Sequence, residues 1–432
     1  MKAYTKEILI PKRELKLGGL SDLRRYYNSP LQAILPLLHR PIRFVVTKTD
    51  TNNYHCELDL IVTEKQDSQL PSGESIFDFR KRTYENTENF NVVLLIPTGI
   101  GAEIGGHCGD GNAVARLIAG ACDTLITHPN VVNASDINEM TENTLYVEGS
   151  IITRLLMGRI DLQRIRSNRL LVLMDKHKEG FFNDEIVNAI SSARVTLGLD
   201  CDVFEMENLI ESVARYSVSG RAIGEIKALE KLFDVIKQYK DDYNAIGLST
   251  FIKVPDHFHK KYFSSDEMIN PWGGIEAILT HSIAEVFNIP CAHSPMMTSS
   301  EIYDLELGIV DPRKAPETSS TTYLHCILKG LHRSPRIVNS GEGLGLKDIS
   351  CVIIPDGCLG LPTLACLEND IPIIAVKENR NSMKNDLREL PFKSGKLFIV
   401  DNYLEAVGVL IALKNGVAPS AVRRPIEHTK IL

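Results

Sequence analysis

The chain has 432 residues, of which 44% are hydrophobic and 24% are charged, and its formal net charge is −7. This length exceeds what one ordinary hydrophobic core serves, so we expect two or three compact units. The acidic balance argues against a general nucleic-acid binder, which would need a basic face. No apolar run approaches the roughly 18 residues of a membrane helix, so we expect neither nucleic acid nor membrane as a partner.

The cysteine content and the N-terminus favour the cytoplasm. Nine cysteines are scattered along the chain, and none forms a Cys-x-x-Cys pair. The first residues lack the apolar segment of a secretory signal. We therefore expect a reducing, cytoplasmic environment rather than a disulfide-stabilised scaffold.

The first 65 residues predict a small α+β module. Its expected elements are a short strand at 8–10, a helix at 23–38 and a hairpin of strands at 42–46 and 56–62, joined by turn-forming residues 50–53. The polar segment 66–90 contains Pro71-Ser72-Gly73 and is interpreted as a linker. Residues 91–432 would then form the main domain.

From residue 91 onward, short β-branched apolar runs alternate with longer amphipathic stretches. Continuous apolar runs suit strands covered on both faces. The expected strands are 92–96, 124–127, 170–174, 245–249, 351–354, 371–376 and 397–400, and the expected helices include 112–121, 222–239 and 274–287. Strand–helix alternation predicts an α/β fold with a doubly wound, mostly parallel, Rossmann-like sheet. Two such halves with the ligand site between them are one arrangement consistent with this pattern.

A glycine-rich loop at 97–111 links the strand at 92–96 to the helix at 112–121. Glycines permit positive φ and close approach of the backbone to a ligand, and the helix N-terminus favours an anion. The residues assigned to substrate binding are Thr98, Gly99, Gly101, Gly105 and Gly106. The spacing lacks the third glycine of a dinucleotide site, and no Walker lysine follows. A turn made for tight packing is the alternative interpretation.

A second strand, loop and helix follow at 351–368. Asp356 and Cys358 come directly after the expected strand, where a parallel sheet presents catalytic groups. A thiol at a helix N-terminus can have a lowered pKa and act as nucleophile or base, whereas a small buried cysteine is the alternative. The segment also resembles the second thiol motif of the aspartate/glutamate racemase superfamily, although Leu359 replaces the usual small hydroxyl residue. That resemblance implies Cys108 as the second thiol.

Histidines supply the remaining candidates for acid–base chemistry. His281 and His293 lie in a region dense in polar residues, and His128 follows the expected strand at 124–127. Each can act as a general acid or base near neutral pH, although partly buried, hydrogen-bonded histidines are the commoner outcome. No metal-binding motif accompanies them, so we assign no metal and no cofactor.

Three further sites are candidates for binding the substrate. Arg313 can clamp a carboxylate or phosphate through two parallel hydrogen bonds, and Glu317 follows in the same segment. Asn130 lies on the expected ligand side, two residues after His128. Ser219-Gly220-Arg221, before the helix expected at 222–239, is another candidate anion cradle or a simple N-cap.

Three long segments resemble an uncharacterised bacterial family, the domain of unknown function 3326. They are Ile96-Pro97-Thr98-Gly99-Ile100-Gly101, Thr127-His128-Pro129-Asn130, and Asn270-Pro271-Trp272-Gly273-Gly274 with Cys291-Ala292-His293-Ser294-Pro295-Met296. The likeness spans about 91–380 and leaves the N-terminal module uncovered. It implies one family unit and carries no activity.

Taken together, these patterns predict a cytoplasmic enzyme that binds a small anionic metabolite, a phosphate or a carboxylate, and performs acid–base or group-transfer chemistry. One alternative is a ligand-sensing protein without turnover, whose N-terminal module docks a partner. Another is a cofactor-independent thiol racemase, isomerase or lyase that uses Cys358 and Cys108. Because cyclic dimers are the commonest assemblies, a homodimer is the expected oligomer.

Overall fold

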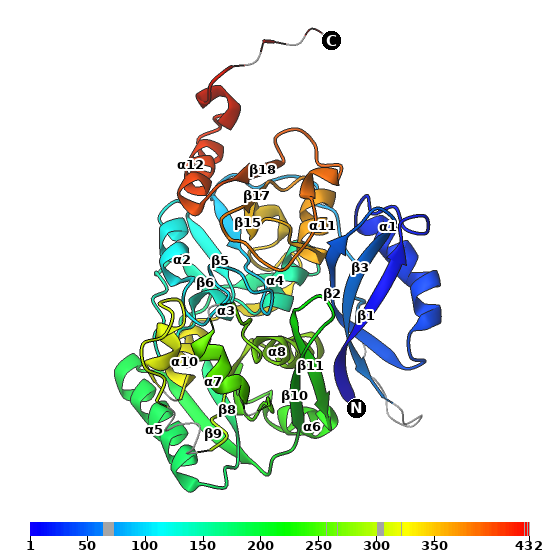
Figure 1. Cartoon of the computed structure of the whole chain (residues 1–432). Coiled ribbons are helices and arrows are strands. Elements are labelled where there is room, and N and C mark those ends of the chain that lie inside the picture. The colour runs from blue at the N-terminus through cyan, green and yellow to red at the C-terminus, as the bar shows by residue number, and fades with distance from the viewer. Residues whose placement is uncertain are drawn as a thin grey trace.

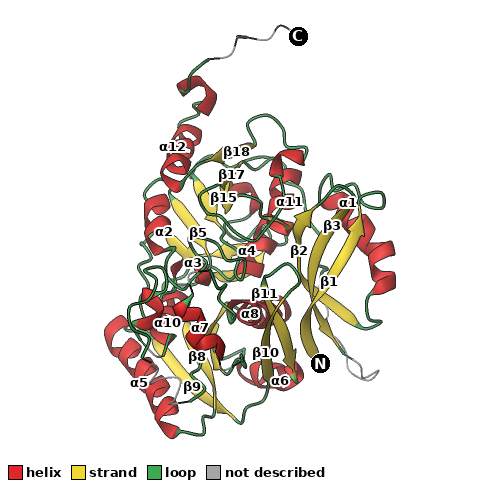
Figure 2. Ribbon diagram, in the orientation of Figure 1, coloured by secondary structure: helices red, strands yellow, loops and turns green. Residues whose placement is uncertain are grey.

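The computed structural model describes residues 1–63, 73–255, 257–265, 267–299, 306–320, 322–426, 428–429 and 431. Two parallel sheets and one antiparallel sheet surround a central region that contains helix α8 (Figures 1 and 2). The chain is therefore an α/β protein with parallel sheets, as the alternation of strands and helices predicts.

The first parallel sheet has the strand order β18-β17-β15-β4-β5-β6, and all its neighbouring strands are parallel. Its strands are β4 (Asn91–Leu94), β5 (Thr124–Thr127), β6 (Thr144–Tyr146), β15 (Ile349–Pro355), β17 (Ile373–Val376) and β18 (Leu397–Val400). Their helices are α2 (Asn112–Ala119), α3 (Pro129–Val132), α4 (Gly149–Leu156), α11 (Leu361–Glu368) and α12 (Tyr403–Lys414). Every residue of the central strands β4 and β15 is buried, which explains their continuous apolar runs.

The second parallel sheet has the order β13-β12-β8-β9. Its strands are β8 (Arg169–Asp175), β9 (Asp200–Met206), β12 (Ala245–Thr250) and β13 (Cys291–Pro295). The helices of this part of the chain are α5 (Gly180–Leu197), α6 (Leu229–Tyr239), α7 (His257–Ser264), α8 (Gly273–Phe287) and α10 (Leu324–His332). The seven strands predicted from apolar runs are all confirmed, as are the helices predicted at 112–121 and 274–287.

The antiparallel sheet has the order β10-β11-β1-β3-β2-β16. Its strands are β1 (Lys2–Pro11), β2 (His39–Thr49), β3 (Asn53–Val62), β10 (Glu211–Tyr216), β11 (Ala222–Lys227) and β16 (Leu359–Gly360). The three N-terminal strands thus share one sheet with residues from the middle and the end of the chain. The division into 1–65, 66–90 and 91–432 stays a prediction. The antiparallel sheet contains strands from both sides of the predicted linker. A separate two-stranded ribbon pairs β7 (Ile160–Gln163) with β14 (Arg336–Asn339).

Two predicted helices are wrong in part. Residues 222–227 form strand β11 rather than the start of a helix, and the helix begins only at Leu229. A side chain at Gly224 would collide with Ile275 of α8, so β11 lies directly on that helix. The helix predicted at 23–38 is α1 (Leu20–Tyr26), followed by a π turn at Tyr27–Leu31 and a 3₁₀ turn at Gln32–Ile34. Pro30 lies inside the π turn and lacks the N–H that a regular α-helix needs.

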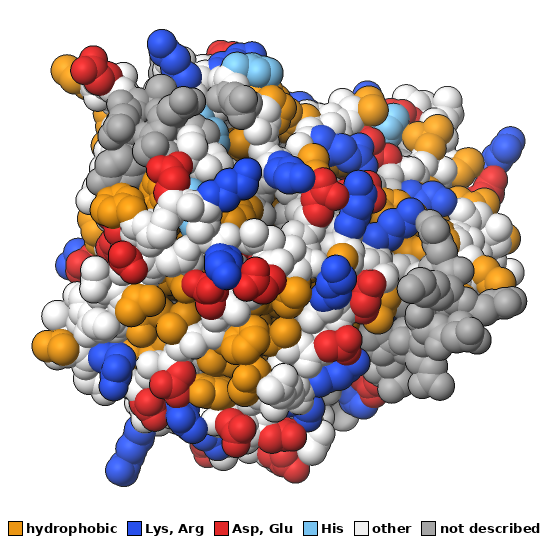
Figure 3. All heavy atoms as spheres, turned by 90° about the horizontal axis from the view of Figure 1, so that it is seen from below, with side chains coloured by type: hydrophobic (Ala, Val, Ile, Leu, Met, Phe, Trp, Pro, Cys, Tyr) orange, Lys and Arg blue, Asp and Glu red, His pale blue; other side chains and the backbone are white. Residues whose placement is uncertain are grey.

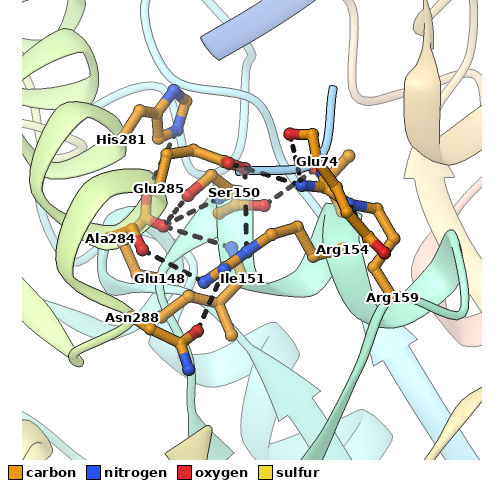
Figure 4. A network of polar contacts seen from close by, with 12 residues as sticks. Glu74, Glu148, Ser150, Ile151, Arg154, Arg159, His281, Ala284, Glu285 and Asn288 are labelled. Atoms are coloured by element: carbon orange, nitrogen blue, oxygen red, sulfur yellow. Dashed lines mark hydrogen bonds and ion pairs between the residues drawn. The ribbon is translucent and has the colours of Figure 1, made fainter. Parts of the chain in front are cut away.

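A buried glutamate of α8 holds α4 in place (Figure 4). The carboxylate of Glu285 lies 3.6 Å from each of the guanidinium groups of Arg40, Arg154 and Arg159. Arg154, on α4, also donates to the carbonyl of Ala284 and to the side chain of Asn288 at the end of α8. These contacts join the C-terminal end of α8 to the last turn of α4.

Replacing Glu285 tests this junction. Glu285→Gln keeps the shape but leaves three largely buried guanidinium groups without their shared anion, so we expect a loss of about 3–5 kcal/mol in the free energy of unfolding. Glu74→Gln is the matched control, because Glu74 pairs with Arg159 from a half-exposed position and its loss should cost less than about 1 kcal/mol. Urea denaturation measures both. Equal losses in the two variants would contradict the structural role of Glu285.

Among the described residues, no helix combines the length and the apolar character needed to cross a membrane.

Candidate functional site

A cavity of about 350 Å³ lies where the three sheets meet. Residues that follow β4, β5, β6 and β15 line it, at the carboxyl ends of these parallel strands, together with residues of β13, β2 and β11. Open α/β sheets bind ligands at this edge, and the volume suits a small metabolite. The titratable side chains that line the cavity are Arg43, Cys108, His128, Glu148, Arg221, His259, Glu276, His281, His293, Glu317, Tyr323, Cys326 and Cys358.

The imidazole of His293 lies between a carboxylate and a hydroxyl group. Its Nδ1 is 3.2 Å from Oε1 of Glu276 on α8, and its Nε2 is 2.9 Å from the hydroxyl of Thr250. This network assigns a proton to Nδ1, which donates to the carboxylate, while Nε2 accepts from the hydroxyl. Thr250 does not line the cavity, so the three residues do not form a nucleophilic triad. They fix Glu276 and leave its Oε2 without a hydrogen bond to any described residue.

His281 lies beside a second fixed carboxylate. Its Nε2 is 3.1 Å from Oε1 of Glu148. Glu148 is the N-cap of α4, and its Oε2 accepts the backbone N–H groups of Ser150 and Ile151 (Figure 4). Because the cap occupies Oε2, Oε1 is held toward the histidine. The other nitrogen of His281, Nδ1, is buried and has no hydrogen-bond partner among the described residues.

His128 is a neutral hydrogen-bond donor rather than a base. Its Nε2 accepts the backbone N–H of Ile96 at 3.1 Å, which leaves the proton on Nδ1. Burial, together with the nearby His281, lowers the pKa of His128 to about 4. Asn130 donates to the carbonyls of Ile96 and Gly105, so its amide braces the glycine-rich loop at the edge of the cavity.

The glycines of the loop allow backbone conformations and close contacts that other residues would not. Gly99, Gly101 and Gly105 have φ values of 74°, 61° and 78°, which side chains rarely allow. A Cβ atom at Gly106 would collide with the carbonyl of Ala102. None of the four lines the cavity, whereas Thr98 does. Their geometry fits the tight-packing interpretation.

Arg313 and Asp356 lie outside the cavity lining. The guanidinium of Arg313 is engaged by Asp311 at 2.6 Å and Glu103 at 2.7 Å, and its side chain is 30% exposed. Asp356 accepts the backbone N–H of Gly357 at 2.9 Å. Both side chains are therefore partnered locally, and the structure does not bring them together with the histidines.

The arginines of the cavity come from strand β2 of the antiparallel sheet and from the residue directly before strand β11. Arg43 of β2 forms two hydrogen bonds with Asp59, of 2.5 and 3.0 Å. Arg221 binds the carboxylate of Glu57. Glu57 and Asp59 are 1% and 0% exposed on β3, and buried carboxylates require such partners. Burial and the charge of Arg43 lower the pKa of Arg221 to about 10, which leaves it cationic at neutral pH.

Sequence reasoning missed Arg43 and treated Arg221 only as an N-cap or anion cradle. The signal that could have found them is the pattern of β3. Glu57 and Asp59 are two residues apart in the buried second half of β3, where their neighbours are apolar, so both point to the same buried face. Two acids on a buried face require cations from neighbouring strands.

Glu317 closes the other side of the glycine-rich loop. Its Oε1 accepts the backbone N–H of Cys108 and the hydroxyl of Tyr262, each at 2.7 Å. The residue is only 4% exposed, and burial raises the pKa of its carboxyl group to about 7. Asp110 of the same loop has a pKa of about 8 for the same main reason.

Three thiols line the cavity, Cys108, Cys326 and Cys358, and burial raises the pKa of each, so none is activated. Burial raises the pKa of Cys358 to about 12 and that of Cys108 well above its ordinary value. The lowered pKa considered for a thiol at this helix N-terminus is not found, because desolvation outweighs the nearby Arg221. Among the described residues, no group of three or more histidines, cysteines and acidic residues is arranged to hold a metal ion.

Residues 91–423 match the model of a family described as a protein of unknown function, DUF3326. The chain belongs to this family. It is also 34% identical, over 339 residues, to an uncharacterised lipoprotein of Synechococcus sp., an alignment that covers 76% of this chain and 92% of the relative. No solved structure matches the chain. The predicted family resemblance is confirmed and extends beyond residue 380, whereas the racemase resemblance is not shown.

The matched range contains both histidine–carboxylate pairs and Arg221. Arg43, Glu57 and Asp59 precede it. In this member of DUF3326, strands outside the family range therefore complete the cavity wall.

The raised pKa of Glu317 predicts a measurable pH dependence. The carboxyl group of Glu317 has a pKa near 7 in the folded state and an ordinary value of 4.5. The folded state therefore holds this proton more tightly, and the free energy of unfolding falls as pH rises from 4.5 to 7, by about 3 kcal/mol over the whole range. Glu317→Gln preserves the acceptor for Cys108 and Tyr262, so the variant should gain stability relative to the wild type from pH 4.5 to 7. Urea denaturation across this range measures the difference.

Glu103→Gln is the matched control in the same loop, because Glu103 is about one-third exposed and pairs with Arg313 and Arg380. Its stability curve should run parallel to that of the wild type. A Glu317→Gln curve with the wild-type slope would contradict the buried, ionising carboxyl group.

Proposed function

We propose that this protein is an enzyme that transfers protons on a small anionic metabolite held in the central cavity. The observation that carries the proposal is the convergence of two histidine–carboxylate pairs and two buried arginines on one cavity. Perturbed titratable groups that gather in one pocket are typical of catalytic sites.

Arg43 and Arg221 bind the anionic group in this proposal. Asp59 engages Nε and Nη2 of Arg43 and leaves Nη1 available. Glu57 engages Nη1 of Arg221, whose Nη2 makes only a 3.5 Å contact with the carbonyl of Thr98. Guanidinium N–H groups form strong hydrogen bonds with carboxylates and phosphates. The acids behind the arginines fix their orientation, so little entropy is lost when the anion binds.

Glu276 and His281 exchange the proton. Glu276 is positioned by His293 and has an oxygen that makes no hydrogen bond with any described residue, which suits a general base. His281 is positioned by Glu148 and lies close enough to His128 and Asp59 to alter their pKa values. It therefore stands on the arginine side, where it can return a proton. The Nδ1–H of His128 can donate a hydrogen bond to the substrate.

The remaining features of the proposal concern fold, partners and location. We propose that the two parallel sheets are Rossmann-like halves of a doubly wound fold and that the protein acts without nucleic acid or membrane, as a homodimer. On the face shown in Figure 3, acidic and basic side chains are interspersed. This supports the proposal that the protein does not bind nucleic acid. All nine cysteines are free, which supports a cytoplasmic location. The name of the Synechococcus relative points instead to a lipid anchor, and cell fractionation distinguishes the two.

Deuterium exchange tests proton transfer before the reaction is known. The protein is incubated in ²H₂O with a panel of carboxylates and phosphates, and mass spectrometry follows deuterium incorporation, while thermal shift measures binding. Glu276→Gln should lower exchange at least about 100-fold and keep the thermal shift given by ligands that carry only an anionic group. Arg221→Met should lose both. Arg313→Met, an arginine outside the cavity, should retain both.

Each other outcome has a clear meaning. Binding without exchange would indicate a ligand sensor rather than an enzyme. Exchange that survives Glu276→Gln but fails in Cys108→Ala and Cys358→Ala would favour the thiol mechanism. Full exchange activity in Arg221→Met would contradict the proposed anion site.

A further inference from the structure

The cavity has two electrostatically opposite ends. Arg43, Arg221, Glu276 and Glu317 all line it. In addition to burial, the charge of Arg43 lowers the pKa of Arg221. In the same way, the charge of Glu276 adds to the effect of burial and raises the pKa of Glu317, so the members of each pair lie close together. Burial raises the pKa of two thiols of the lining, but the charge of Arg221 offsets part of the rise at Cys358, whereas the charges of Glu317 and Glu276 add to the rise at Cys108.

The carboxylate end has two oxygens without a protein partner. Oε1 of Glu317 is occupied by Cys108 and Tyr262, and Oε1 of Glu276 is occupied by His293. The Oε2 atoms of both glutamates make no hydrogen bond with any described residue. Two carboxylates that face one cavity are costly to remove from water unless a cation joins them.

The cation that lies nearest in the chain is already engaged. The ammonium group of Lys314 is buried and donates to the carbonyls of Tyr262 and Ser265. Two aromatic side chains adjoin the same end: Tyr323 donates to the carbonyl of Glu317, and Trp272 packs on Tyr262 with ring centroids 5.5 Å apart. Both line the cavity, and aromatic rings near carboxylates favour a bound ammonium group.

We propose that the substrate is zwitterionic, with its anionic group at Arg43 and Arg221 and an ammonium group at Glu317 and Glu276. This inference rests on the proposed function and names its substrate class: small amino carboxylates or amino phosphates. One molecule can carry both charges, because a single cavity of about 350 Å³ contains both ends.

Matched pairs of probes test the inference. The pairs are 4-aminobutanoate with butanoate, 6-aminohexanoate with hexanoate, and 2-aminoethyl phosphate with ethyl phosphate. Calorimetry and thermal shift at pH 8 should show the amino member of at least one pair binding about 10- to 100-fold more tightly, the effect of one charged hydrogen bond. The carboxylate and phosphate pairs distinguish the two sources of the anion.

Variants separate the two ends of the cavity. Glu317→Gln and Glu276→Gln should each reduce or remove the advantage of the amino member while keeping the binding of its partner probe. Arg221→Met should weaken both members alike. Glu103→Gln, a loop carboxylate outside the cavity lining, should behave as the wild type.

The pH dependence of binding can be measured on the wild type, so this test does not depend on whether a variant folds. As the pH rises from 6 to 8, Glu317 ionises, so the advantage of the amino probes should grow in the wild type and stay nearly constant in Glu317→Gln. Equal affinities of the paired probes in the wild type would overturn the zwitterion while leaving the anion site in place. Failure of every probe to bind would overturn the proposed function and this inference together.

Discussion

The buried pairing of Glu57 and Asp59 with Arg43 and Arg221 is the constraint on which the site depends. Two carboxylates in a strand interior are tolerable only with cations at hydrogen-bond distance. Those cations come from β2 and from β11, which is more than 150 residues away in the sequence. The pairing therefore fixes the N-terminal strands against the middle of the chain and presents the guanidinium groups to the cavity. The N-terminal sheet is a wall of the site and not an appendage.

A second buried charge cluster performs the same task for the helices. Glu285 gathers Arg154 and two other arginines, so α4 and α8 keep a fixed relation. Those two helices carry the site: Glu148 caps α4, while Glu276 and His281 lie on α8. Breaking one of these buried pairs would leave an uncompensated charge and strongly destabilise the fold. The ion pairs therefore fix the positions of the residues for which proton transfer is proposed.

The sequence predicted local features well and predicted contacts between distant parts of the chain poorly. Apolar runs predicted seven strands because strands covered on both faces have no polar positions. Strand β11 was missed because its short alternating pattern merges into the helix that follows. His281 and His293 were recognised as polar residues in a functional region, and both line the cavity. Arg313 does not, because Asp311 and Glu103 engage it outside the cavity. The two acids of β3 indicate that cations are needed, but the sequence alone does not show that Arg43 supplies one of them.

Burial selects which groups can move protons in this cavity. Desolvation raises the pKa of any acid, but the starting values differ. A thiol starts near 9, and burial takes Cys358 to about 12, where it stays protonated at neutral pH. A carboxyl group starts near 4, and the same effect takes Glu317, which lines the cavity, to about 7. Acid–base catalysis is most efficient when the pKa lies near the working pH. The burial that keeps the thiols protonated therefore brings this carboxyl group into the useful range, which supports the proposed carboxylate chemistry over a thiol mechanism.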